Sequence, residues 1–178
     1  MLTIDPLTVP ADAVDEAKTY LRIDQNEEDG AVAVLLSAAI RHCEGFIGQL
    51  LIRRNAVDRM PVSAAWQRID VTPVQSITSV TGIPAEGSTF LLPVGAYALD
   101  IDENGDGWVR VTQPGAAGRV DVRAQAGLSV DWSGVPDPLR LGVLRLVGHL
   151  HAYRDDASDG GPPAAVAALW RPWRRMAL

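Results

Sequence analysis

The sequence has little of what defines secreted, redox-active or membrane-spanning proteins. Cys43 is the single cysteine among 178 residues, which excludes an internal disulfide and a thiolate metal cluster. No uninterrupted apolar run is long enough to span a bilayer. The N-terminal segment carries early acids and no basic region, so it is not a signal peptide. We therefore expect a cytosolic product whose cysteine is a buried structural thiol.

Signatures of catalysis are also missing. The chain has no Gly-x-Ser-x-Gly nucleophile elbow, and Gly105-Asp106-Gly107 lacks the Lys-Ser/Thr of a phosphate-binding loop. Of the three histidines, His149 and His151 stand two positions apart on a predicted helix, so they point to different sides and do not share a metal ion. The sequence predicts no catalytic residue, no metal ligand set and no cofactor, and we expect a protein that is not an enzyme.

Composition favours a folded protein that does not coat nucleic acid. Apolar residues make up 47% of the chain and charged residues 21%, which is typical of a globular domain with a real core. The formal net charge of −6 disfavours a protein that neutralises many phosphates, because that requires clustered cations.

Helical periodicity is strongest near the two ends of the chain. Apolar residues from Val32 to Leu50 recur at the i, i+3, i+4, i+7 spacing of one helix face. Pro136-Asp137-Pro138 is a typical helix start ahead of another apolar stripe. The pattern predicts N-terminal helices over about 13–22 and 27–50, a helix over about 137–154, and a short C-terminal helix over about 163–171.

Between these helices, residues 53–130 have β-type character. Short runs between Pro and Gly residues predict strands at Gln67–Thr72, Ser76–Thr81, Thr89–Leu92, Tyr97–Ile101, Trp108–Thr112 and Arg119–Ala126. The last run alternates cleanly, with Val120, Val122, Ala124 and Ala126 on one face, as an antiparallel sheet with one buried face requires. Apolar residues from Val74 to Ile83 have a period of three, which predicts a β-bulge. The fold class is therefore α+β, a helical frame with a β-rich antiparallel insertion.

The predicted helix over 137–154 is apolar on more than one face. Leu139, Val143 and Leu146 belong to one stripe, while a second side carries Leu141, Leu144 and Gly148. A helix that is apolar on two sides must be covered on two sides. We expect a neighbouring subunit to cover Leu141, Leu144 and Gly148.

The loop from Asp100 to Asp106 carries oxygen side chains at alternate positions, as a calcium loop does. It lacks the closing bidentate Glu and the flanking helices of an EF-hand, because the closing positions are Val111 or Gln113. A polar hairpin turn is the favoured interpretation, and a calcium-binding module is an alternative that a thermal melt with added calcium tests.

The C-terminal segment is basic and rich in tryptophan in an acidic protein. Trp and Arg are enriched where binding energy concentrates. We expect a single domain over 1–155, then a flexible joint and a docking arm over 156–178. The candidate binding residues of the arm are Leu169, Trp170, Arg171, Trp173, Arg174 and Arg175. Two alternatives stay open: the tail folds back on its own core, or it contacts nucleic acid as part of a DNA-binding packaging protein.

An ordered series of motifs runs through nearly the whole chain. The series consists of Glu16–Asp24, Glu28-Asp29, Ala38-Ala39, Glu44–Gly48, Leu51-Ile52, Val74–Val80, Tyr97 with Asp100, Pro136–Arg140 and Leu146–Arg154. In this order the motifs resemble the phage head–tail connector (adaptor) proteins, a family found in long-tailed phages, prophages and gene transfer agents.

This resemblance implies a structural part of a virion or phage-like particle, assembled in the bacterial cytoplasm. Such proteins form a ring, twelve-fold in this family, beneath the portal and join the DNA-filled head to the stopper and tail. Its implied partners are the portal protein, the stopper or tail-completion protein and further copies of the chain, with no membrane. DNA would pass through the channel without specific binding, because an acidic wall repels it. The resemblance also implies that the Trp/Arg arm binds the portal.

Overall fold

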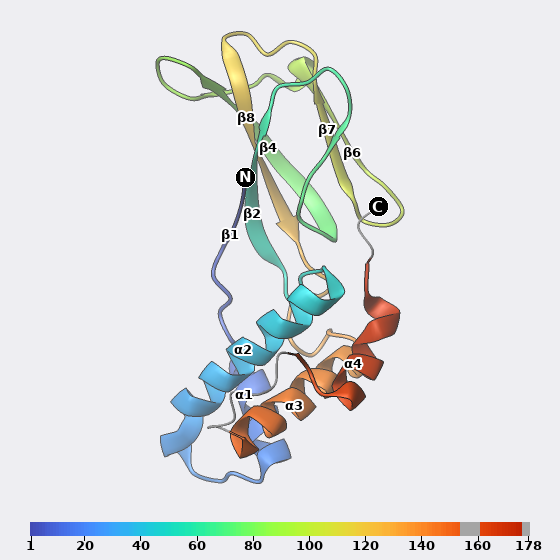
Figure 1. Ribbon diagram of the computed structural model, residues 1–178. Helices are drawn as coiled ribbons and strands as arrows, with labels where there is room; N and C mark the ends of the chain where they lie inside the picture. Colours follow the sequence, from blue (N-terminus) through green and yellow to red (C-terminus); the bar gives the residue numbers. More distant parts are fainter. Residues whose placement is uncertain (154–160, 176–178) are drawn as a thin grey trace. The chain divides into compact units, whose positions relative to one another are not determined.

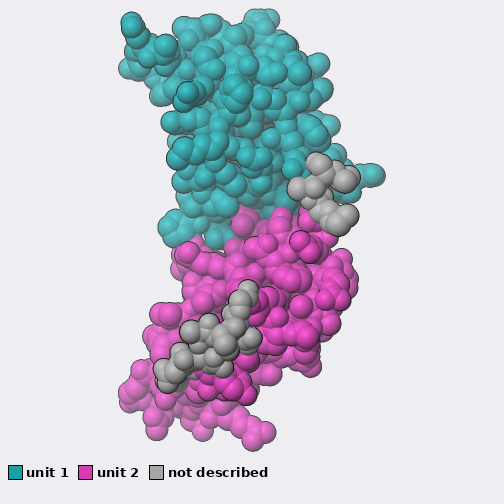
Figure 2. Space-filling model, in the orientation of Figure 1, with its two compact units in different colours: residues 1–6, 53–128 teal, residues 7–52, 129–178 magenta. Residues whose placement is uncertain are grey.

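The chain forms two compact units, one built of strands and the other of helices. The computed structural model describes residues 1–153 and 161–175. Unit 1 comprises Met1–Pro6 and Arg53–Leu128 and is built of strands, and unit 2 comprises Leu7–Ile52 and Ser129–Leu178 and is built of helices (Figures 1 and 2). The α+β fold class expected from the sequence is confirmed.

Unit 1 contains two antiparallel sheets. The first has the order β1-β2-β8-β4-β5, formed by β1 (Leu2–Ile4), β2 (Arg54–Pro61), β8 (Ala117–Ala126), β4 (Val74–Pro84) and β5 (Phe90–Leu91). The second has the order β3-β7-β6, formed by β3 (Gln67–Arg68), β7 (Gly107–Val111) and β6 (Tyr97–Ile101), with the short 3₁₀ helix η2 (Val94–Ala96) before β6. All pairs in both sheets are antiparallel.

Strand β8 forms as its alternation predicts. Val120, Val122, Ala124 and Ala126 are all buried, while Arg119, Arg123 and Gln125 are exposed. The bulge expected in the period-three run is confirmed, because the β4–β8 register shifts between Val74 and Ser76, between Ile77 and Ser79, and between Ile83 and Pro84. These shifts let a period-three apolar sequence remain in a strand.

Strand β2 was not predicted, although it is a central strand of eight residues. Its buried face consists of Ala56, Asp58 and Met60, so a carboxylate interrupts the apolar alternation. The Asp58 side chain is satisfied by long-range partners: it accepts hydrogen bonds from the Met1 amine (3.3 Å) and from the Asp70 amide (3.0 Å). The alternation of apolar and polar residues did not predict this strand, because a charged residue occupies a buried position and its hydrogen-bond partners are distant in sequence.

Unit 2 contains the helices. These are α1 (Ala11–Leu21), α2 (Asp29–Ile47), α3 (Asp137–Ala152) and α4 (Ala164–Trp170), with 3₁₀ turns η1 (Asn26–Glu28) and η3 (Arg171–Trp173). All four helices were expected within a few residues of these bounds. Residues 154–160, which include the end of the expected third helix and most of the expected joint, lie outside the described residues.

The core of unit 2 forms where the apolar stripes of its helices meet. Val32, Leu36, Ile40 and Ile47 of α2 are buried, as are Leu139, Val143 and Val147 of α3. Within the described part of the chain, Asn26–Ile47 is the one segment long and apolar enough to cross a membrane by length and composition. A core helix passes the same test, and one face of α2 is buried against the helices of its own unit.

Candidate interaction surfaces

Helix α4 packs against α3 and α2 through the side chain of Trp170. This side chain is completely buried. Its Nε1 donates a hydrogen bond to the Leu139 carbonyl oxygen (3.3 Å), and its ring centroid lies 5.8 Å from that of Phe46. Gly142 leaves the space that the indole fills, since an added Cβ at 142 would lie 2.8 Å from both Cδ1 and Cε2 of Trp170. Trp170 is therefore a core residue of unit 2.

The turn η3 and the residues after it are fixed to the end of α2. Gln49 Nε2 donates to the Trp173 carbonyl oxygen (2.7 Å), and the Arg175 amide donates to the Ile47 carbonyl oxygen (2.9 Å). The Arg174 guanidinium lies 5.8 Å from the centre of the Phe46 ring, a cation–π distance. These bonds hold the C-terminal segment up to residue 175 in one place on unit 2.

The predicted arm residues therefore divide into one anchor and five surface residues. The expectation that Trp170 is a binding residue of a docking arm needs correction, because its large ring is buried on Gly142 and Phe46 and so stabilises the alternative in which the tail folds back on its own core. Arg171 and Arg174 are exposed, and Leu169, Trp173 and Arg175 are half-buried. These five line a surface of unit 2 and remain candidates for binding a partner.

The three α3 residues predicted to contact a neighbouring subunit also divide. Leu141 is 37% exposed, as an interface residue would be. Leu144 is buried within the chain. An added Cβ at Gly148 would lie 3.2 Å from Cε1 of Tyr20 in α1, so α1 covers this position. Leu144 and Gly148 are therefore covered by other residues of unit 2, whereas we expected from the sequence that a neighbouring subunit would cover them.

The Asp100–Asp106 loop is a hydrogen-bonded hairpin turn between β6 and β7. One Asp102 carboxylate oxygen accepts from the Asn104 amide (2.9 Å) and the Asp106 amide (3.0 Å), and the other accepts from Trp108 Nε1 (3.1 Å). Gly105 has φ +76°, the left-handed conformation that such a turn requires. Within residues 1–153 and 161–175, no group of three His, Cys, Asp or Glu side chains is placed to hold a metal ion. The loop geometry favours the turn over the calcium module.

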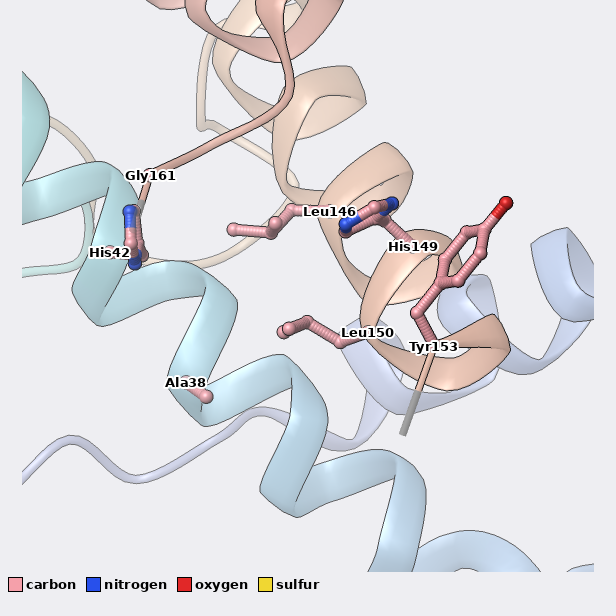
Figure 3. A pocket seen from close by; sticks show the side chains of 7 residues that line it. All are labelled: Ala38, His42, Leu146, His149, Leu150, Tyr153 and Gly161. Atoms are coloured by element: carbon pink, nitrogen blue, oxygen red, sulfur yellow. The ribbon is translucent and has the colours of Figure 1, made fainter. Parts of the chain in front are cut away.

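A pocket of about 230 Å³ lies between α2 and α3. Figure 3 shows its lining, with His42 on α2 across from His149 on α3 and Leu146 and Leu150 between them. The His149 ring also packs on the Tyr153 ring, with centroids 4.8 Å apart. His151 does not line the pocket, which agrees with the expected divergence of His149 and His151. The arrangement offers a small apolar hollow with a polar rim and no metal ligand set.

The environment of Cys43, the single cysteine, makes its thiol unreactive. Cys43 is completely buried in α2, and burial raises the pKa of its thiol well above the ordinary range, followed by a smaller contribution from Glu44. A thiol that stays protonated is neither a nucleophile nor a metal ligand. This agrees with the structural role expected from the sequence.

Two surfaces of unit 1 were not singled out in the sequence. The first is around Trp66, which is 42% exposed and has the Arg110 guanidinium 4.8 Å above its ring. Trp66 follows two alanines in a loop, so no periodic pattern marked it. Its place opposite Arg110 depends on the β3–β7 pairing, which sequence reading did not determine.

The second surface is the outer face of the five-stranded sheet. We call Arg59, Arg119 and Arg123 the arginine face; they project from β2 and β8 on the side opposite buried Val120 and Val122. Arg59 forms a two-bond ion pair with Asp121 (2.8 and 2.9 Å). The hydrogen bond from Arg59 holds the pKa of the Asp121 carboxyl below its usual range, with Arg123 adding to the effect.

Comparison with solved structures finds relatives along the whole chain. A chain in the neck of an empty gene transfer agent (GTA) particle, computed with C6 symmetry, matches with a TM-score of 0.80 and 26% identity over 100% of this chain and 97% of that one. A chain in the virion of a native GTA particle matches with a TM-score of 0.76, again at 26% identity and over 100% and 97% of the two chains. A chain in the neck of a native GTA particle computed with C12 symmetry gives 0.75 and 26% over 99% and 97%.

No protein-family model matches the chain, and no curated protein matches it either.

Proposed function

We propose that this chain, a member of the head–tail connector family, forms a ring in the neck of a phage-like particle, beneath the portal. Its similarity to GTA neck chains over both units confirms the resemblance seen in the sequence. The chain is a structural component related to those of gene transfer agent particles. The ring and its position between portal and tail are the proposal.

The observation that carries this proposal is the full-length match to chains of symmetric necks. One matched neck was computed with C6 symmetry and another with C12 symmetry, and the same chain fold occurs in both. A ring built from copies of one chain uses head-to-tail contacts that close after a fixed number of subunits. We therefore propose that copies of this chain surround a channel through which DNA passes, with the twelve-fold number that the family implies.

The C-terminal segment is the proposed portal-binding surface. Arg171 and Arg174 are exposed next to half-buried Leu169 and Trp173, which gives an apolar patch with a cationic rim. Trp170 holds this patch in place from below, in contact with Gly142. A pre-formed surface has less conformational entropy to lose on binding than a free arm. Leu141 on α3 is the proposed contact with the adjacent subunit.

A deletion strain tests the proposal. Without the chain, producing cells should assemble DNA-filled heads that lack tails, and supplying the chain from a plasmid should restore tailed particles. A matched control is the Gly45→Ala chain, since an added Cβ at 45 meets no atom within 4 Å. Normal tailed particles in the deletion strain would overturn the connector role.

Two alternatives have less support. A DNA-binding packaging protein would need a cationic surface, and the net charge is −6, although the arginine face is locally basic. A calcium-binding module would need free carboxylate oxygens in the β6–β7 turn, and those of Asp102 are occupied by hydrogen bonds.

A further inference from the structure

We propose that in the ring, unit 1 of one copy docks its β6 strand edge on the arginine face of unit 1 of the next copy. We define the β6 edge as Leu99, Asp100, Ile101 and Glu103, which lie on β6 and the turn after it. This inference rests on the proposed ring and names one contact that closes it.

Strand β6 forms an outer edge of its sheet. In the order β3-β7-β6, β6 has a hydrogen-bonded neighbour in its sheet on one side only. Leu99 is 36% exposed and Ile101 39% exposed, although their cross-strand partner positions on β7, Val109 and Gly107, are buried. Edge strands usually carry charged side chains, a Pro or a bulge that hinders pairing with another chain. Strand β6 (Tyr97–Ile101) has no Pro and no bulge, and its one charged residue is the exposed Asp100, so a partner for this edge has to accommodate negative charge.

The β6 edge is also acidic. Asp100 and Glu103 are both exposed. The nearby acids are committed to local structure: Asp102 holds the turn, and Asp106 lies 3.9 Å from the Arg68 guanidinium. A partner for this edge should therefore offer positive charge and some apolar surface that Leu99 or Ile101 can contact.

The arginine face offers positive charge and a small hollow with an apolar wall. Arg119 and Arg123 are exposed and form no ion pair with any residue in the described ranges. Asp121, between them along β8, is already neutralised by Arg59. A pocket of about 140 Å³ opens on the same face, lined by Met1, Thr3, Val57, Arg59 and Asp121. Val57 gives it an apolar wall that Leu99 or Ile101 of a neighbouring copy can contact.

The two surfaces lie on different sides of unit 1, as a closed ring requires. The arginine face points away from the buried side of its sheet, whereas β6 belongs to the second sheet. That second sheet packs on the buried side, since an added Cβ at Gly107 of β7 would lie 3.0 Å from side-chain atoms of Val74 and Ile69. One copy can therefore present its β6 edge to one neighbour and its arginine face to the other, which is a head-to-tail contact.

Charge-reversal variants test this contact in assembled particles. The edge variant is Asp100→Arg with Glu103→Arg, the face variant is Arg119→Glu with Arg123→Glu, and the swap variant combines all four. Glu86→Arg, an exposed acid in the loop after β4, is the matched control. Each chain is supplied to the deletion strain, its copies per particle are counted by quantitative mass spectrometry, and its thermal melt is recorded to show that it folds.

We expect the edge variant and the face variant each to lower incorporation at least roughly tenfold, because like charges then meet across the contact. The swap variant should recover most of the loss, and the control should match the unmodified chain. If folded single-surface variants incorporate normally while the unmodified chain is present in particles, this contact is wrong but the connector role stands. If only the face variant fails, the arginine face binds another molecule such as DNA, and the inference is overturned. Absence of the unmodified chain from particles would overturn the connector role itself.

Discussion

The indole of Trp170 occupies the space that a side chain at Gly142 would need. An added Cβ at 142 would lie 2.8 Å from two indole carbons, well inside contact distance. The absence of a side chain on α3 thus lets α4 approach closely enough for Trp170 Nε1 to reach the Leu139 carbonyl oxygen. This relationship holds the proposed portal-binding surface on unit 2.

Gly142→Ala should therefore destabilise the protein. The methyl group overpacks a buried site, which typically costs about 1–3 kcal/mol and exceeds the roughly 1 kcal/mol that Ala contributes to a helix interior. We expect a lower urea midpoint and a changed tryptophan emission spectrum. Gly45→Ala is the matched control, because the added Cβ has open space on α2 and should leave stability equal or higher. Equal effects of the two substitutions would contradict the packing described for Trp170.

Which tryptophan is buried could not be deduced from composition. Trp170 and Trp173 stand among arginines, which is typical of a binding surface, yet Trp170 is buried and Trp66 is 42% exposed. The deciding feature for Trp170 is Gly142, 28 positions earlier, and a single sequence does not show that these positions meet. The stripes of α2 and α3 and the alternation of β8 were predictable because each is a local pattern. Strand β2 was not, because the partners of Asp58 are Met1 and Asp70.

The surface arginines of the C-terminal segment should matter for binding and little for folding. Arg171→Glu combined with Arg174→Glu removes exposed positive charge and the Arg174–Phe46 cation–π contact, which is worth about 0.5–1 kcal/mol at an exposed site, so the thermal midpoint should fall only slightly. Binding to particles that retain their portal but lack this chain should fall. Equal binding by the double variant would contradict the proposed portal-binding surface. Truncation before Val166 is a poor test, because it removes the buried side chains of Val166 and Trp170 and so weakens the fold.

The Arg59–Asp121 ion pair should give the protein a specific pH dependence. The hydrogen bond from Arg59 lowers the pKa of Asp121 in the folded chain. A carboxyl whose pKa is lower in the folded than in the unfolded chain stabilises the folded state. This stabilisation is complete above the ordinary aspartate pKa of about 3.9, and it is lost as the pH falls through the lowered pKa of the folded chain. Asp121→Asn should therefore lower the urea midpoint slightly at pH 7 and not in strong acid. The contribution is small because the Arg59 side chain is 47% exposed and solvent screens the pair. A variant effect that grows as the pH falls would contradict this assignment.

Calcium should not bind the β6–β7 turn. The Asp102 carboxylate already accepts three hydrogen bonds, so metal binding would have to break them. We expect the same thermal midpoint with millimolar calcium and with a chelator. Asp102→Ala should lower the midpoint in both, since it leaves the Asn104 and Asp106 amides without this acceptor, at a cost of about 1–3 kcal/mol. A calcium-dependent rise in the midpoint of the unmodified chain would contradict the turn assignment.

The most direct test of the connector role is a cryo-electron microscopy map of the neck of particles from the producing organism. We predict a ring of this chain between portal and tail, with exposed Arg171 and Arg174 facing the portal and Trp170 buried on Gly142 within each copy. A neck map that accounts for every ring without this chain would contradict the central claim.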